Sequence, residues 1–249
     1  MSALSIEVRN EVAVFTLNRP KANALDSGLI AEISSAFASH TTARAVVLAS
    51  ALPGLFSAGW DLPLLVDSDR KAMQEFLGRF CDLVREIFVF GPPVVAALSG
   101  HAIAGGLILA MAADERIAAE GKGKVGLSEV ILGVPVPACC LEVFRHAIGA
   151  RAMERLAATG ENLAVDRALA AGLVDRIAPA EELLDRAVER ARILAGLSAA
   201  AYASIKLRTR AAAIARFDQA RERDPFLDFW FSQDARFRIK DMVARLGAR

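Results

Sequence analysis

Residues 91–114 read GPPVVAALSGHAIAGGLILAMAAD and carry the strongest signal for the fold. Nothing between Glu86 and Asp114 carries a formal charge, and a stretch of that length could cross a bilayer. The breaks at 91–93, 99–101 and 105–106 leave pieces too short to do so, and such breaks in lipid expose unsatisfied backbone groups. We therefore expect a buried unit of strand, turn and helix, with the strand at Val94–Leu98 and the helix from Gly105 onwards.

Strand and helix patterns alternate on both sides of this stretch. Residues 5–17 alternate around Arg9-Asn10-Glu11, which predicts a β-hairpin, and Asp26 is a candidate N-cap for the helix that follows. Further strands are expected at Ala45–Ala49 and Arg116–Ala119, and further helices at Met73–Ile87, Leu141–Ile148, Ala150–Ala158 and Val165–Ala171. Strands that alternate with helices predict an α/β core.

The last third of the chain has helix patterns only, at Glu181–Leu194, Ala199–Arg221 and Pro225–Leu246. We expect a core of residues 1–195 and a helical region of 196–249 that packs on this core or on a neighbouring subunit. The cations of the helical region are expected to form a solvated face; they are Lys206, Arg208, Arg210, Arg216, Arg221 and Arg223.

Charge and cysteine content exclude several classes of protein. Thirty Lys and Arg balance 29 Asp and Glu, so general attraction to nucleic acid or to an anionic membrane is not expected. Cys81, Cys139 and Cys140 form no CxxC pair and are expected to be core thiols, and the three histidines are scattered, so no metal site is expected. Charges within the first 11 residues argue against a signal peptide and favour the cytoplasm.

Two segments combine a strand with small residues that lead towards a helix, namely FSAGWDL at Phe56–Leu62 and GHAIAGG at Gly100–Gly106. Small residues let a ligand approach the backbone, and a helix N-terminus has free N–H groups. Two such ends that face each other would form an oxyanion hole. Otherwise these glycines serve only turns and strand–helix packing. A triad of Ser57, His101 and Asp61 is a weaker alternative.

With these segments, the sequence resembles the crotonase, or enoyl-CoA hydratase/isomerase, superfamily. The resembling blocks follow one another over most of the chain; they are Asn18–Leu25, Phe56–Leu62, Gly100–Asp114, Gly126–Gly133 and Thr159–Pro179. The resemblance implies a spiral of ββα turns, with a C-terminal helical region that builds homotrimers or hexamers made of two trimers.

The resemblance also implies acyl-CoA thioesters as substrates, with coenzyme A as part of the substrate and no separate cofactor. It assigns the oxyanion hole to the N–H groups of Ala58 and Gly105. Further substrate-binding residues implied by it are Ala22, Ala24, Gly59, Trp60, Asp61, Leu62, Gly106 and Ser128. Lys240 and Arg245 are weak candidates for contacts with the phosphates of a neighbouring subunit's CoA. Trp60 either narrows the substrate channel or caps the core.

One departure from the family pattern concerns the reaction. Hydratases of this family use two glutamates, and here Ile108 stands at the first position while Glu129 remains at the second. Ile108 cannot hold water, whereas one carboxylate suffices to move a proton from C2 to C4 of a 3-enoyl-CoA. This favours a 3-enoyl-CoA to 2-enoyl-CoA isomerase in which Glu129 is the acid and base. An apolar wall of Ile108, Leu132, Val134 and Pro135 is expected to raise the pKa of Glu129.

Other interpretations of the site stay open. A different polar group could replace the missing glutamate and allow hydration, decarboxylation or thioester hydrolysis. The protein could also bind acyl-CoA without catalysis. Glu129 could finally be a solvated loop carboxylate with no part in a reaction.

Overall fold

The computed structural model describes residues 2–9 and 11–247, so Asn10 of the predicted hairpin turn lies outside the described residues. Two sheets are present. The larger has the strand order β1-β2-β3-β5-β7-β10, with β1 and β2 antiparallel and the other neighbours parallel. Its strands are Leu4–Arg9, Val12–Leu17, Ala45–Ser50, Val94–Leu98, Glu115–Ala119 and Arg176–Ala178.

The smaller sheet has the order β4-β6-β8-β9, in which β4, β6 and β8 are parallel. Its strands are Gly54–Ser57, Gly100–Ile103, Lys124–Gly126 and Asn162–Ala164. Successive strands enter the two sheets in turn, since β3, β5 and β7 join the larger and β4, β6 and β8 the smaller. This is the spiral of ββα turns that the resemblance implied.

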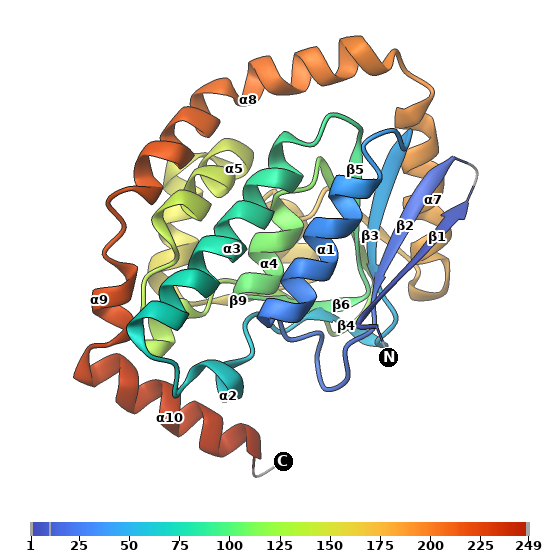
Figure 1. Ribbon diagram of the computed structural model, residues 1–249. Coiled ribbons are helices and arrows are strands. Elements are labelled where there is room, and N and C mark those ends of the chain that lie inside the picture. The colour runs from blue at the N-terminus through green and yellow to red at the C-terminus, as the bar shows by residue number, and fades with distance from the viewer. Residues whose placement is uncertain (1, 10, 248–249) are drawn as a thin grey trace.

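Helices complete each turn of the spiral (Figure 1). Those of the core are α1 (Ser27–Ser39), α2 (Leu62–Leu65), α3 (Arg70–Val89), α4 (Gly105–Met111), α5 (Ala138–Thr159), α6 (Val165–Ala170) and α7 (Leu183–Ala195), with short 3₁₀ turns η1 (Glu129–Leu132) and η2 (Ala180–Glu182). Asp26 caps α1, because its side chain accepts the N–H of Leu29 at 2.8 Å. Gly149 is non-helical, with φ 79°, and divides α5 at the position the sequence predicted.

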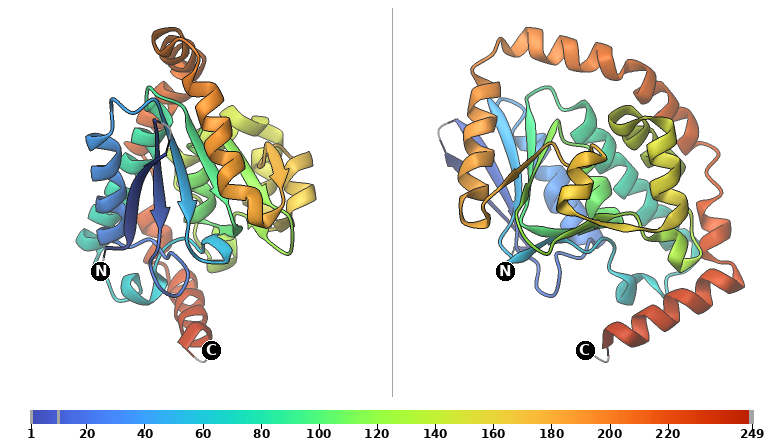
Figure 2. Two further views of the ribbon diagram at one scale, coloured as in Figure 1. Left: turned by 90° about the vertical axis from the view of Figure 1, so that its right-hand side faces the viewer. Right: turned by 180° about the vertical axis from the view of Figure 1, so that it is seen from behind.

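The larger sheet separates two cores. Val46 and Leu48 of β3 point into the main core with α1 and α3, whereas Val47 packs against α7 on the opposite face. Figure 2 shows α7 on that side of the sheet, and Tyr202 near the start of the following helix also packs against this second core. A strand buried on both faces reads as a continuous apolar run, which is why residues 45–49 were recognisable.

The strand β6 corrects the sequence prediction, which placed a turn at Ser99-Gly100-His101. The backbone pairs with β4 instead, and a Cβ on Gly100 would lie 1.9 Å from the carbonyl oxygen of Gly54. Only glycine permits this contact between strands, so Gly100 marks a close approach rather than a chain reversal.

The C-terminal helices α8 (Ala199–Arg221), α9 (Phe226–Trp230) and α10 (Gln233–Gly247) wrap around the core of their own chain (Figure 1). The predicted single helix over Pro225–Leu246 is wrong, because the chain turns between α9 and α10. The predicted division at residue 195 falls between α7 and α8. The described helices include none that is both long and apolar enough to span a bilayer.

The solvated-face prediction is wrong for two cations of α8. Lys206 and Arg210 are buried and bind Asp114 at 2.8 and 2.9 Å. Arg216 and Arg221 also pair with residues of the core, Glu142 and Asp82. Because the anionic partners lie 74–139 residues earlier in the chain, the pattern of α8 alone does not reveal them.

Candidate active site

The carboxyl ends of β4, β6 and β8 meet at one edge of the smaller sheet. The N–H of Ala104, after β6, donates to the carbonyl of Gly126 at the end of β8. The loop after β4 lies against the start of α4, since a Cβ on Gly59 would be 3.1 Å from the nitrogen of Gly105. The carboxyl edge of parallel strands is where α/β folds bind ligands. The two glycine-containing segments predicted to face each other therefore do meet.

The loop of residues 18–25 packs across this edge. Its residues Lys21, Ala22 and Asn23 have φ values of 70°, 142° and 46°, in the left-handed region that non-glycine residues rarely adopt. The buried Asn23 holds this conformation: its side chain accepts the N–H of Arg19 at 2.8 Å and donates to the carbonyl of Phe56 at 2.9 Å. Backbone strain that is supported in this way often marks a functional site.

This loop corrects the predicted oxyanion hole. The N–H of Ala58 donates to the carbonyl of Ala22 at 3.1 Å and is therefore not free to bind a substrate oxygen. Within residues 2–9 and 11–247, by contrast, the N–H groups of Trp60 and Gly105 have no acceptor. Gly59, with φ 90°, turns the backbone between Ala58, whose N–H is bonded, and Trp60, whose N–H is free. The free pair is Trp60 and Gly105, two residues away from the prediction on the first segment.

Glu129 begins η1, three residues after β8. It is 8% exposed, so its interpretation as a solvated loop carboxylate is wrong. Burial raises the pKa of Glu129 to about 7, although nearby backbone groups of Glu129 and Ser128 oppose the shift. Its Oε2 atom has no hydrogen-bond partner among the described residues. The predicted direction of the pKa shift is confirmed. With this pKa, the carboxyl group can bind or release a proton near neutral pH.

The side chain of Trp60 lies between the site and an aromatic cluster. Its ring makes edge-to-face contacts with Phe76, Phe80 and Phe226, with centroids 5.1–5.4 Å apart. On its other side the indole lies against Gly105, where a Cβ would be only 2.7 Å from Cδ1 of the ring. Residue 105 therefore has to be glycine for the indole to occupy this place. The ring packs on the core, as one of the two alternatives for Trp60 expected. That Trp60 narrows the substrate channel stays a prediction.

Arg19 fastens the two loops to each other, a role that sequence reasoning missed. Its guanidinium binds Asp26 at 2.9 Å and Asp61 at 2.7 Å, and it donates to the carbonyl of Ala24. The carboxylate of Asp61 also accepts the N–H of Leu64 at the start of α2. Arg19 lies in the quoted loop, but its partners are set by the fold and leave no local signal.

The remaining predicted binding residues reach the same edge. The N–H of Leu62 donates to Trp60, and Ser128 directly precedes η1. Gly106 serves packing, because a Cβ there would lie 2.4 Å from the carbonyl of Ser57. Substrate contacts of these residues, and of Ala22, Ala24, Gly59 and Asp61, stay predictions.

The alternative triad is not assembled. The Ser57 hydroxyl donates to the carbonyl of Asn23, the N–H of Lys124 binds the His101 ring, and Asp61 pairs with Arg19. The three cysteines are buried core thiols, as predicted, with the Sγ atoms of Cys81 and Cys139 3.2 Å apart. That no metal binds to them stays a prediction.

The last helix lies on its own chain beside η1. A Cβ on Gly133, just after η1, would lie 2.9 Å from Oδ2 of Asp234 in α10. Arg245 of α10 pairs with Asp241 at 2.8 Å. A contact of Lys240 or Arg245 with a neighbour's CoA stays a prediction.

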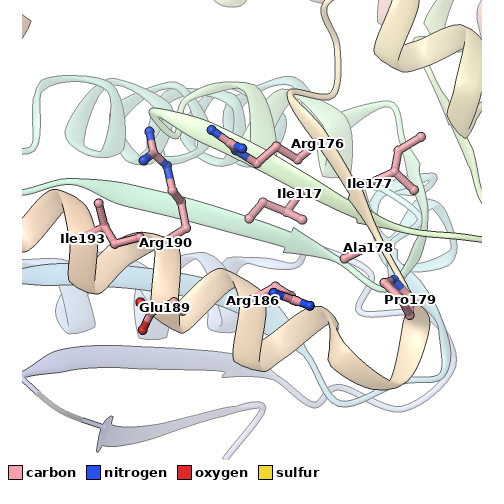
Figure 3. A pocket seen from close by; sticks show the side chains of 9 residues that line it. All are labelled: Ile117, Arg176, Ile177, Ala178, Pro179, Arg186, Glu189, Arg190 and Ile193. Carbon is pink, nitrogen blue, oxygen red and sulfur yellow. The ribbon is translucent and has the colours of Figure 1, made fainter.

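A surface pocket of about 560 Å³ lies elsewhere, between β10 and α7 (Figure 3). Its cations Arg186 and Arg190 are paired with Glu182 and Glu115. Its other charged side chains, Arg176 and Glu189, are also in ion pairs, so the carboxyl edge of the smaller sheet is the better candidate.

Fold and site together define an α/β protein of the crotonase type, with free amides and a buried carboxyl group at one edge. The sequence matches the profile described as enoyl-CoA hydratase/isomerase over residues 7–236, and the chain belongs to this family. A carnitinyl-CoA dehydratase of Salmonella arizonae is 32% identical over 84% of this chain and 80% of that protein.

Solved structures agree with this assignment. The human mitochondrial delta3-delta2-enoyl-CoA isomerase has a TM-score of 0.93 and 25% identity, covering 99% of this chain and 98% of that one. An Mtb enoyl-CoA isomerase has a TM-score of 0.83 and 30% identity, covering 89% and 96%.

Proposed function

We propose that this protein converts 3-enoyl-CoA into 2-enoyl-CoA, with Glu129 as the single acid and base. The observation that carries the proposal is the buried carboxyl group of Glu129, which has an unpartnered oxygen and a pKa raised to about 7. A group with this pKa takes and returns a proton at neutral pH with similar ease.

The free N–H groups of Trp60 and Gly105 would hold the thioester oxygen. As the Glu129 carboxylate removes a proton from C2, negative charge develops on that oxygen and spreads over a dienolate. Fixed donors stabilise this charge without reorganisation; one such donor is typically worth about 3–4 kcal/mol. Protonated Glu129 then returns the same proton to C4, and the double bond lies between C2 and C3. Atoms and charge balance with no further reactant.

The residue at position 108 supports isomerisation over hydration. Ile108 is fully buried in the core and has no group that could orient water. The TM-score of 0.93 with the human mitochondrial isomerase points the same way, since solved enoyl-CoA hydratases among the neighbours have TM-scores of 0.82–0.83. Carnitinyl-CoA dehydratases among the relatives favour a second candidate, the removal of water from a hydroxyacyl-CoA.

We also keep the homotrimer, or hexamer of two trimers, and the cytoplasmic location as proposals. Large apolar side chains are exposed near the site, including Phe237 at 74% and Ile131 at 48%. Apolar surface of this kind supports an interface with a second copy.

The test is to incubate the purified protein with a 3-enoyl-CoA and, separately, with a 2-enoyl-CoA and a 3-hydroxyacyl-CoA. Conversion of the 3-enoyl thioester without mass change, lost in Glu129→Gln, is the expected result. A change of 18 mass units with either of the other thioesters would instead establish hydration or dehydration. Binding of acyl-CoA that is insensitive to Glu129→Gln, without turnover, would make the protein a binder.

A further inference from the structure

Buried polar atoms of Trp60, Trp230 and Glu129, all at or next to the candidate site, lack a hydrogen-bond partner. The described chain has four such side-chain atoms: Nε1 of Trp60, Nε1 of Trp230, Oε2 of Glu129 and Nε of Arg116. Native proteins satisfy nearly all buried polar groups, so each exception calls for a ligand or another cause. Glu129 is accounted for by the proposed proton transfer. The indole N–H of Trp60 has no role in that reaction.

The indole of Trp60 is held in a defined place. Phe76, Phe80 and Phe226 contact its ring edge-on, and Trp230 lies 6.2 Å away between centroids. The edge that carries Nε1 borders Gly105, since a Cβ on Gly105 would lie 2.9 Å from Nε1. The N–H therefore lies beside the amide that the proposed function assigns to the thioester oxygen. If the thioester oxygen binds at the Gly105 amide, the acyl chain attached to that thioester is the part of the substrate nearest to this N–H.

We propose that the Trp60 indole N–H donates a hydrogen bond to a neutral oxygen on the acyl chain, so that oxygen-bearing acyl-CoA thioesters are the preferred substrates. This inference rests on the proposed binding of acyl-CoA at this edge. Trp60 acts as a specificity-determining residue. A pure hydrocarbon chain leaves the N–H without a partner in the complex, whereas a hydroxyl or keto oxygen satisfies it.

The charge of the site selects a neutral oxygen over a carboxylate. A carboxylate in the acyl chain would lie at the same sheet edge as the carboxyl group of Glu129, whose ionised form would repel it. The guanidinium of Arg19, which lies in the adjoining loop, is already bound by Asp26 and Asp61. An uncharged indole donor therefore suits an uncharged acceptor.

The experiment uses the fact that the chain has two tryptophans, Trp60 and Trp230. Full-length Glu129→Gln protein, in which turnover is removed, is labelled with ¹⁵N at the indole nitrogens. Trp60→Phe assigns the two N–H resonances. Hexanoyl-CoA, 3-hydroxyhexanoyl-CoA and 5-hydroxyhexanoyl-CoA are then titrated, and binding is measured by calorimetry.

At least one hydroxylated thioester is expected to shift the Trp60 N–H proton downfield and to bind roughly tenfold tighter than hexanoyl-CoA. Trp60→Phe should remove this preference. Trp230→Phe is the matched control, because it alters the same aromatic cluster and should retain the preference.

Equal affinity for all three thioesters, or a preference that survives Trp60→Phe, overturns the inference while acyl-CoA binding stands. Absence of binding by any thioester overturns both the inference and the proposed function. A Trp60 shift in a protein whose wild type fails to isomerise 3-enoyl-CoA would retain the inference and reject the isomerase.

Discussion

Asp114, whose side chain is 9% exposed, and the buried Glu129 are two acidic residues with little contact to solvent, yet their hydrogen-bond partners differ completely. Asp114 accepts from Lys206 at 2.8 Å, from Arg210 at 2.9 Å and from the N–H of Val94 at 2.7 Å. Glu129 pairs with no cation among the described residues, and its Oε2 has no donor.

The difference separates stability from reactivity. A fully paired buried carboxylate holds α8 on the core, and removal of one partner leaves an uncompensated charge. An unpaired one costs stability but keeps its pKa near neutrality and its oxygen free for a substrate proton. Replacement of each carboxyl group by a neutral amide should therefore have opposite consequences: Glu129→Gln should lower activity, and Asp114→Asn should lower stability.

The largest expected effect is on the rate of Glu129→Gln. With no group left to move the C2 proton, kcat for 3-enoyl-CoA should fall at least about 1,000-fold, while the melting temperature stays level or rises. Steady-state kinetics and thermal unfolding measure the two quantities. A variant that retains a tenth of the activity would show that Glu129 is not the base.

Asp114→Asn should have the reverse effect. Lys206 and Arg210 would remain buried without a counter-charge, and the free energy of unfolding should fall by about 3–5 kcal/mol. Burial already lowers the pKa of Lys206 to about 8, which Asp114 opposes. Denaturant unfolding gives the loss of stability, and kcat per folded molecule should change less than about threefold. Unchanged stability would contradict the role of this cluster as a clamp.

The stability of the protein should depend on pH through the buried carboxyl group of Glu129. Burial raises the folded-state pKa of Glu129 from 4.5 to about 7, so the folded protein binds this proton more tightly than the unfolded chain. The stabilising contribution is full below about pH 4.5 and is lost as the pH rises through 7, a change of about 3 kcal/mol.

This loss should be absent in Glu129→Gln. The difference in unfolding free energy between wild type and variant, measured from pH 4.5 to 8, isolates the contribution from all other groups. A difference that does not vary with pH would mean that Glu129 titrates at its ordinary pKa.

Arg19→Lys should give the smallest effect. A lysine cannot bind Asp26, Asp61 and the carbonyl of Ala24 together, so the loops that present the Trp60 amide should loosen. We expect a stability loss of about 1 kcal/mol and a roughly tenfold lower kcat/KM. Arg151→Lys is the control, since Arg151 is 91% exposed and its pair with Glu154 is remote from the site. Equal effects of both substitutions would show that Arg19 does not position the loops that present the Trp60 amide.

The amino-acid sequence was sufficient to predict the elements whose signals are local. The alternation of buried strands with helices, the Asp26 cap and the break at Gly149 follow from the preferences of a few neighbouring residues. The carboxyl group of Glu129 and the small residues of both glycine segments were equally visible, because the chemistry belongs to the residues themselves.

Which hydrogen-bonding groups are left without a partner depends on how distant segments pack in the fold. The N–H of Ala58 donates to the carbonyl of Ala22 and is therefore not available to a substrate. The φ of 142° at Ala22 depends in turn on the contact of the Asn23 side chain with the carbonyl of Phe56. Lys206 and Arg210 became buried because Asp114 lies beneath them in the fold. Hydrogen-bond occupancy and burial arise between segments distant along the chain. The available donors of a site therefore cannot be read from one segment alone.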